Sequence, residues 1–222
     1  MTTELVVLDM AGTTVADDGL VVRAFTAAIE TAGVPEDRYP EMLRYVTDTM
    51  GQSKITVFRA LLEDETRARQ ANSAFEAAYG KLVEAGECTP VPGAEDVVRG
   101  LRENGVKVAF TTGFAPATQQ AILDALGWRG LADLALAPGD GVRGRPFPDL
   151  VLTAALRLEV TDVRRIAVVG DTASDVLCGL RAGASVVAGV LTGAGRREDL
   201  LEATHVLGSV SELPAVLEGE PR

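Results

Sequence analysis

The sequence contains four short motifs whose residue types could bind and attack a phosphoryl group. The first is Asp9-Met10-Ala11-Gly12-Thr13-Thr14, in which a carboxylate follows a short apolar run. A carboxylate at the end of a strand can act as a nucleophile or hold a metal ion. The glycine and threonine after it form a turn whose backbone N–H groups can face a phosphate. Taken alone, this motif is explained equally well by an aspartate that caps a turn.

The second and third motifs offer hydrogen-bond donors and a positive charge. Thr111-Thr112-Gly113 follows another apolar run, and its hydroxyl and N–H groups suit a phosphate oxygen. An ordinary Thr-Gly turn is the simpler interpretation of that motif by itself. Gly144-Arg145-Pro146-Phe147-Pro148 precedes a helical pattern, and Arg145 carries a planar, permanent positive charge that matches phosphate oxygens. A solvated surface arginine is the alternative.

The fourth motif, Gly170-Asp171-Thr172-Ala173-Ser174-Asp175, indicates a metal site. Two acidic residues four positions apart at a strand-to-helix turn suit Mg²⁺, a hard cation that prefers oxygen ligands. The competing interpretation is that Asp171 or Ser174 simply caps the helix that follows.

The elements around these motifs predict an α/β fold with a doubly wound, Rossmann-like parallel sheet. Short apolar runs rich in valine are typical of buried parallel strands, and helical patterns lie between them. Strands that alternate with helices predict a doubly wound sheet. Strands are expected at Leu5–Leu8, Val106–Phe110, Ala132–Leu136, Arg165–Val169, Ser185–Val190 and Thr204–Leu207. Helices are expected at Ala94–Asn104, Ala117–Leu126, Pro148–Leu158 and Ser174–Ala182.

One segment, residues 15–86, interrupts this alternation. It has helical patterns only, at Leu20–Ala32, Tyr39–Thr49, Lys54–Leu62 and Glu65–Leu82. We therefore expect an inserted helical cap over 15–86 and a catalytic core made of 1–14 and 87–222. Such an insert would lie above the strand ends, where open α/β sheets bind ligands.

Composition restricts the classes of partner. The net charge of -11 argues against nucleic acid and anionic membranes, which require a basic patch. Cys88 and Cys178 are too few for a disulfide framework and are expected to be reduced thiols in a cytoplasmic protein. The single histidine, His205, excludes histidine-rich metal sites and is expected to be structural. Neither an N-terminal signal nor a membrane-spanning run is visible.

In this order, the four motifs resemble those of the haloacid dehalogenase superfamily. Its members carry Asp at the first strand end, Thr at the second, a basic residue before a later helix, and Gly-Asp-x-x-x-Asp at a further strand end. The resemblance covers most of the chain and implies that the insert is an all-helical cap domain. It also implies a hydrolase that binds Mg²⁺ through Asp9, the Ala11 carbonyl and Asp171, with Asp175 as a weaker or more distant ligand.

Two departures from the phosphatases of that superfamily narrow the resemblance. Most of them carry a second Asp two residues after the nucleophile, as general acid for the leaving oxygen, whereas this sequence has Ala11. They also usually carry Lys where this chain has Arg145. Both features, with Gly12-Thr13-Thr14 and Thr111-Thr112-Gly113, are similar to the phosphonatase-like clade.

The predicted cap adds a further match, Met50-Gly51-Gln52-Ser53-Lys54. It resembles the phosphonatase segment Met-Gly-x-x-Lys, whose lysine forms a Schiff base with the substrate aldehyde. Gly51 would end one helix and Lys54 would begin the next, and the positive end of a helix dipole lowers the pKa of an amine. That would help Lys54 to attack a carbonyl. Without the surrounding motif, a solvated surface lysine would be the simpler interpretation.

The resemblance implies cleavage of the C–P bond in phosphonoacetaldehyde or a similar carbonyl phosphonate. An iminium at Lys54 would accept the electrons of the leaving carbon as an enamine. Asp9 would attack phosphorus, and water would later hydrolyse the aspartyl phosphate. Besides Asp9 and Lys54, the implied catalytic residues are Arg145 and Thr112, and the implied substrate- and phosphate-binding residues are Ala11, Gly12, Thr13, Met50, Gly51, Thr111 and Gly113.

One difference from the phosphonatases leaves the substrate open. They usually carry a histidine three residues after the lysine, and this chain has Val57. The substrate could therefore be another phosphonate or a phosphate ester. Two other functions stay open: a phosphate monoesterase that does not use Lys54, and a non-catalytic protein that binds a phosphoryl ligand. The resemblance also suggests a homodimer formed through the cap.

Overall fold

The computed structural model describes residues 2–139 and 141–219. Its centre is a six-stranded parallel sheet in the order β3-β2-β1-β4-β5-β6. The strands are β1 (Leu5–Asp9), β2 (Lys107–Thr111), β3 (Leu134–Leu136), β4 (Ile166–Gly170), β5 (Val186–Val190) and β6 (His205–Leu207). The order reverses at β1, so the predicted doubly wound sheet is confirmed.

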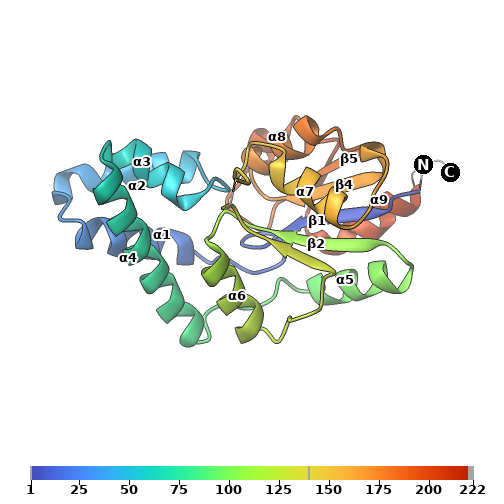
Figure 1. Cartoon of the computed structure of the whole chain (residues 1–222), viewed down its shortest axis with the longest axis horizontal. Helices are drawn as coiled ribbons and strands as arrows, with labels where there is room; N and C mark the ends of the chain where they lie inside the picture. Colours follow the sequence, from blue (N-terminus) through green and yellow to red (C-terminus); the bar gives the residue numbers. More distant parts are fainter. Residues whose placement is uncertain (1, 140, 220–222) are drawn as a thin grey trace.

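Helices cover both faces of this sheet (Figure 1). On one side lie α7 (Asp149–Arg157) and α8 (Ala173–Ala182), which contact the central strands. On the other side lie α5 (Ala94–Glu103), α6 (Pro116–Ala125) and α9 (Leu213–Gly219). The prediction did not include α9.

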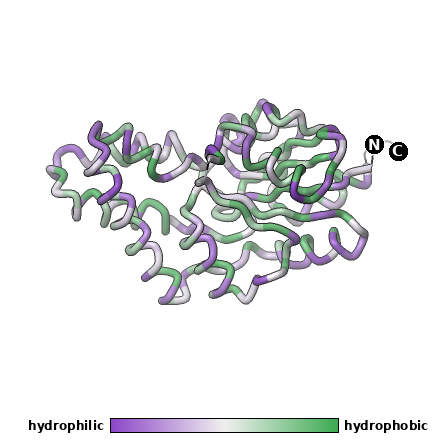
Figure 2. Tube along the Cα trace, viewed as in Figure 1, coloured by the Kyte–Doolittle hydropathy of each residue, from purple (hydrophilic) through white to green (hydrophobic). Residues whose placement is uncertain are grey.

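Residue alternation along β1 explains why both layers are apolar. Leu5 and Val7 belong to the apolar cluster with α7 and α8, whereas Val6 and Leu8 belong to the cluster on the opposite face. Side chains of a strand alternate between faces, so a strand buried on both sides must be apolar throughout. Figure 2 shows the sheet as hydrophobic and many outer turns as hydrophilic.

The remaining helices form the inserted cap, which lies at the left of Figure 1. They are α1 (Leu20–Thr31), α2 (Tyr39–Asp48), α3 (Lys54–Leu62) and α4 (Glu65–Glu84). Each coincides with a helix predicted from the sequence to within two residues at either end. These helices fall inside the predicted insert 15–86, although the domain boundaries themselves stay a prediction.

The cap has an aromatic centre that also receives a side chain from the core. Phe25 of α1 packs against Phe58 of α3 and Phe75 of α4, at ring-centroid distances of 4.7 and 4.8 Å. Phe114 follows β2 in the core, and its ring lies 4.6 Å from Tyr79 and 6.1 Å from Phe75. This contact joins the loop after β2 to the cap.

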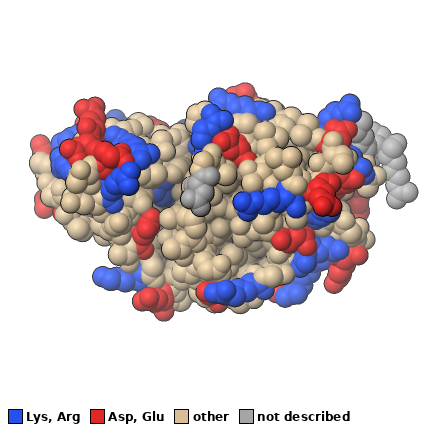
Figure 3. Space-filling view, in the orientation of Figure 1, with Lys and Arg blue, Asp and Glu red and all other residues tan. Residues whose placement is uncertain are grey.

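The surface carries charges of both signs. On the face drawn in Figure 3, Lys and Arg side chains lie close to Asp and Glu. Exposed ion pairs such as Arg143–Asp149 and Arg99–Glu95 contribute to this arrangement. Among the residues described, no helix is both long enough and apolar enough to pass through a bilayer.

Candidate active site

The predicted chemistry-bearing residues meet at the carboxyl ends of the central strands. Asp9 ends β1 and pairs in register with Thr111, which ends β2. Asp171 directly follows β4, the neighbour of β1 on its other side. Parallel strands bring their carboxyl ends to one edge, and ligands of open α/β sheets bind there at the point where the strand order reverses. β1 is that point in this sheet.

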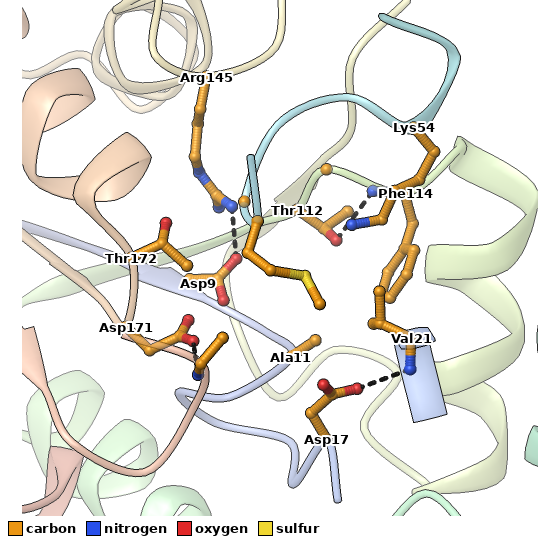
Figure 4. A pocket seen from close by; sticks show the side chains of 14 residues that line it. Asp9, Ala11, Asp17, Val21, Lys54, Thr112, Phe114, Arg145, Asp171 and Thr172 are labelled. Atoms are coloured by element: carbon orange, nitrogen blue, oxygen red, sulfur yellow. Dashed lines mark hydrogen bonds and ion pairs between the residues drawn. The ribbon is translucent and has the colours of Figure 1, made fainter. Parts of the chain in front are cut away.

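A cavity lies between this edge and the cap (Figure 4). Its volume is about 30 Å³, so the cap and the core lie close together around it. The cavity is lined by Asp9, Ala11, Asp17, Val21, Met50, Gly51, Lys54, Thr112, Gly113, Phe114, Arg145, Asp171, Thr172 and Ala194.

Arg145 connects the acidic residues at the floor of the cavity. Its Nη1 lies 2.6 Å from Asp9 Oδ1, and its Nε lies 2.8 Å from Asp175 Oδ1. Its Nη2 donates to Thr111 Oγ1 at 2.7 Å. Only 5% of Arg145 is exposed, so the alternative of a solvated surface arginine is wrong. In this structure its donors hold two carboxylates and a threonine, an arrangement that sets the orientation of Asp9.

The three buried carboxylates fit a divalent cation. One oxygen each of Asp9, Asp171 and Asp175 can be chosen so that all lie within 4.8 Å of one another. The pKa of Asp9 is raised to about 6: burial is the largest cause, Arg145 opposes it, and the charge of Asp175 adds to it. The pKa of Asp171 is also raised well above 3.8, first by burial and then by Asp9 and Asp175. Three carboxylates with one guanidinium leave excess negative charge, which a cation would offset.

The oxygen atoms available to such a cation differ between the candidate ligands. Within the described chain, the Ala11 carbonyl accepts no hydrogen bond, so its oxygen is available. Both Asp175 oxygens are already engaged, one by Arg145 and the other by the Thr172 backbone N–H at 3.1 Å. Thr172 and Asp175 form the capping box of α8. Asp175 thus caps a helix and holds Arg145, and its role as a weaker metal ligand stays a prediction.

Asp171 is held tightly by its surroundings. Its Oδ2 accepts the Ala194 N–H at 2.7 Å, and its Oδ1 accepts the Thr13 hydroxyl at 3.4 Å. A Cβ added to Gly12 would lie 2.5 Å from Asp171 Oδ2, and one added to Gly193 would overlap the same carboxylate. Gly12 also has a φ of +91°, which glycine adopts without strain. Glycine is therefore required at position 12 by both sterics and backbone conformation.

Lys54 enters the same cavity from the cap. It is the first residue of α3, and its backbone N–H donates to the Gly113 carbonyl of the core at 3.2 Å. Its side chain is 7% exposed, and Nζ lies 5.8 and 5.2 Å from the ring centroids of Phe25 and Phe114. The pKa of Lys54 is lowered from 10.5 to about 8, and burial is the largest cause. The sequence predicted that the helix dipole would lower this pKa, whereas burial of the amine is the largest cause.

Two glycines allow the cap to approach the core so closely. A Cβ on Gly51 would overlap the Thr172 hydroxyl, and Gly51 has a φ of +83°. A Cβ on Gly113 would lie 2.5 Å from the carbonyl oxygen of Gln52. Any other residue at these two positions would hold the cap away from the strand ends.

Most of the predicted site residues line the cavity, and the others contact those that do. The predicted site residues that do not line the cavity are Gly12, Thr13, Thr111 and Asp175. Val57, which stands where the phosphonatases carry histidine, is buried in the apolar cluster. His205 lies on β6 beside Thr204 and does not line the cavity. Both cysteines are buried and free, as expected.

Five residues that line the cavity were not predicted as site residues: Asp17, Val21, Phe114, Thr172 and Ala194. Asp17 could have been noticed, because Asp17-Asp18-Gly19 directly precedes a helix and breaks an otherwise apolar stretch. Phe114 directly follows the motif Thr111-Thr112-Gly113, and Thr172 lies within the acidic motif between Asp171 and Asp175. Ala194 has no signal in the sequence, and only the tertiary structure brings its N–H to Asp171.

Comparison with known proteins agrees with this geometry. Residues 3–183 match the haloacid dehalogenase-like hydrolase family, and the chain belongs to that family. The chain is therefore a hydrolase with the α/β core and helical cap described above.

The chain is also similar to proteins named phosphonoacetaldehyde hydrolase. It is 31% identical to the enzyme named so from Bordetella pertussis, over 86% of this chain and 73% of that protein. It is also 31% identical to the one from Bacillus cereus, over 87% of this chain and 77% of that protein.

Solved structures show the same fold. A hydrolase from Pseudomonas syringae has a TM-score of 0.86 at 21% identity, with all of both chains covered. A phosphonoacetaldehyde hydrolase-like protein from Oleispira antarctica has a TM-score of 0.83 at 25% identity, with 98% of this chain and 92% of that chain covered.

Proposed function

We propose that this protein is a magnesium-dependent hydrolase that cleaves the C–P bond of phosphonoacetaldehyde or a similar carbonyl phosphonate. The observation that supports this most strongly is that a buried lysine of the cap and a buried aspartate of the core line one small cavity. An amine whose pKa is about 8 is partly unprotonated near neutral pH and can attack a carbonyl. The similarity to enzymes named phosphonoacetaldehyde hydrolase supports the same substrate class.

In the proposed reaction, Lys54 Nζ condenses with the substrate carbonyl and releases water. A carboxylate oxygen of Asp9 then bonds to phosphorus as the C–P bond breaks. The bonding electrons pass to the iminium, which becomes an enamine. Water hydrolyses the aspartyl phosphate. The enamine carbon that lost phosphorus takes up a proton from solvent to give an iminium again, and a second water hydrolyses this iminium to release the aldehyde from Lys54. When bound by Asp9, the Ala11 carbonyl and Asp171, Mg²⁺ would offset the repulsion between carboxylate and phosphonate.

The remaining site residues would position the phosphoryl group. Thr112 and Gly113 are proposed to face the phosphonate oxygens from the end of β2. Gly12 and Thr13 are proposed to do so from the turn after β1. Arg145, already bound to Asp9, would hold the nucleophile and stabilise developing negative charge. Met50 and Gly51 would border the aldehyde end of the substrate.

A phosphate-release assay with phosphonoacetaldehyde tests the proposal. Release is expected to require Mg²⁺ and to stop when a chelator is added. Borohydride with substrate should inactivate the enzyme and label Lys54. The Lys54→Ala variant should be inactive, whereas Lys81→Ala, which changes an exposed lysine of α4, should be fully active. Unchanged release by Lys54→Ala would refute the Schiff-base mechanism.

A phosphate monoesterase that uses Asp9 but not Lys54 is the second candidate, and some solved structures with this fold are named phosphatases. One of them is named a putative phosphoglycolate phosphatase, from Lactobacillus delbrueckii, with a TM-score of 0.81 at 20% identity. That identity bears on the fold alone. Ala11 counts against this function, because an alkoxide leaving group needs a proton donor and alanine has none. Hydrolysis of p-nitrophenyl phosphate or sugar phosphates that is independent of Lys54 would favour the monoesterase.

A further inference from the structure

Asp17 is a carboxylate of the cavity that the reaction outlined above does not use. It lies in the segment that leads from β1 into α1, and it lines the same cavity as Asp9 and Lys54. Figure 4 shows it well apart from Asp171 and Arg145, below Ala11. It is therefore placed away from the carboxylates that suit a metal ion.

One Asp17 oxygen has a structural partner, and the other does not. Asp17 Oδ1 accepts the Val21 N–H in the first turn of α1 at 3.0 Å. Across residues 2–139 and 141–219, Oδ2 has no hydrogen-bond or ion-pair partner, and Asp17 is half-buried beside the cavity. The structure thus leaves one carboxylate oxygen available to a ligand.

Asp17 and Lys54 affect each other through their charges. After burial, Asp17 is the largest influence on Lys54 and raises the pKa of its ammonium, ahead of Asp9. Burial raises the pKa of Asp17 above 3.8, and Lys54 opposes that change. Yet the two groups form no ion pair within 4.0 Å among the described contacts. Both side chains line the cavity that would hold the reacting carbonyl.

Imine formation requires proton transfer in this part of the cavity. When Lys54 starts as an ammonium, it must lose two protons to become an iminium. Both protons must reach the carbonyl oxygen, which leaves as water while the C–O bonds break and the C=N bond forms. Val57 is buried in the cap and His205 lies on a distant strand, so a histidine cannot carry these protons. Asp9 is held by Arg145 and is needed at phosphorus.

We propose that Asp17 carries protons from Lys54 Nζ to the carbonyl oxygen during formation of the imine. This inference rests on the proposed function. In each transfer, the Asp17 carboxylate accepts a proton from nitrogen and the resulting carboxyl donates it to oxygen. The carboxylate is regenerated each time, so charge and atoms balance.

The test isolates imine formation from C–P cleavage by using an Asp9→Asn background. The variant lacks the nucleophile, so borohydride trapping of phosphonoacetaldehyde on Lys54 reports imine formation alone. Asp17→Asn is added because asparagine keeps the oxygen that accepts the Val21 N–H. Asp18→Asn is the matched control, since Asp18 is the exposed neighbour of Asp17.

We expect Asp17→Asn to slow trapping by about a hundredfold, as is common for loss of a proton-transfer group. Asp18→Asn should leave the rate unchanged. Trapping at an equal rate in the Asp17→Asn and control variants would overturn the inference about Asp17 but not the proposed function. No labelling of Lys54 in the Asp9→Asn protein would overturn both. The far-UV circular dichroism spectrum checks that each variant is folded.

A second pair of variants separates proton transfer from support of α1. Asp17→Glu keeps a carboxylate and Asp17→Gln does not, although both are longer than aspartate. Faster trapping by the glutamate variant is expected, and equal rates would overturn the inference.

The pH profile tests whether the charge of Asp17 acts on Lys54. Because Asp17 raises the pKa of Lys54, its removal should shift the rise of trapping with pH to lower pH. An unshifted profile would overturn the inference. The other groups that influence these two residues are Asp9, Arg145 and Asp171 around Lys54, and Asp18, Tyr79 and Cys88 around Asp17.

Discussion

Replacing Lys54 by methionine should abolish phosphate release and, at neutral pH, stabilise the fold. Methionine has a similar length and no charge, so it can occupy the same apolar surroundings. The pKa of Lys54 falls from 10.5 in the unfolded chain to about 8 in the folded protein. Below pH 8 the lysine is therefore charged in both the unfolded and the folded protein. The folded protein then bears the full free-energy cost of burying the ammonium.

The size of this cost follows from the pKa difference. One pKa unit corresponds to about 1.4 kcal/mol, so burial of the charged amine costs about 3 kcal/mol below pH 8. Between pH 8 and 10.5 the unfolded chain binds a proton that the folded chain lacks, so the stability of the wild type rises with pH. The advantage of Lys54→Met should thus fall from about 3 kcal/mol at pH 7 to about 1 kcal/mol at pH 10. This figure already includes the attraction of Asp17 and Asp9 for the ammonium, because both contribute to the pKa of about 8.

Urea denaturation at pH 7 and pH 10 measures this difference directly. In thermal unfolding at pH 7, the gain in unfolding free energy should raise Tm by roughly 6 to 12 °C for a chain of this size. Lys81→Met changes an exposed lysine and should alter stability little at either pH. A difference between wild type and Lys54→Met that is the same at both pH values would refute the reasoning. So would a variant less stable than the wild type at pH 7.

Four further predictions concern the metal, the arginine, the cap contact and the assembly. The affinity for Mg²⁺ should weaken by up to about tenfold per pH unit as pH drops below about 6, because protons then compete for Asp9; isothermal titration that finds constant affinity from pH 5 to 7 would contradict this. Arg145→Met should destabilise the fold by about 3–5 kcal/mol in urea, because Asp9 and Asp175 would be left buried and uncompensated, and wild-type stability would argue against it. Gly113→Ala should disfavour cap closure by about 1–3 kcal/mol and reduce phosphate release accordingly, whereas Gly80→Ala, with open space around its added Cβ, should not; equal activity of the two would show that the contact is dispensable. Sedimentation analysis tests the predicted homodimer, and a monomer at assay concentration would exclude it.

The local structure of this chain was largely readable from its sequence. The apolar runs that end at Leu8, Phe110 and Val169 correspond to β1, β2 and β4, because strands buried on both faces must be apolar throughout. The motifs were placed correctly at strand ends for the same reason. In contrast, the short helix α9 was missed, because a seven-residue segment gives too little periodicity to detect.

The tertiary structure decided what the motif residues contact. The sequence predicted Arg145 for phosphate, yet its guanidinium binds Asp9 and Asp175. It predicted Asp175 as a weaker ligand, and the fold engages both of its oxygens. Hydrogen bonds between side chains far apart in the chain depend on packing and leave no periodic signal.

The sequence by itself determined the α/β class, the inserted helices and the positions of Asp9 and of the acidic motif at Asp171, which both lie at strand ends. These features depend on apolar periodicity and on residue types at strand ends, both of which are local. Only the tertiary structure decided that Lys54 is buried between aromatic rings in the cavity of Asp9, and that Asp17 lines the same cavity. The lowered pKa of Lys54 has its main cause there, because burial is a property of the packed cap and core and not of the residues beside it in the chain.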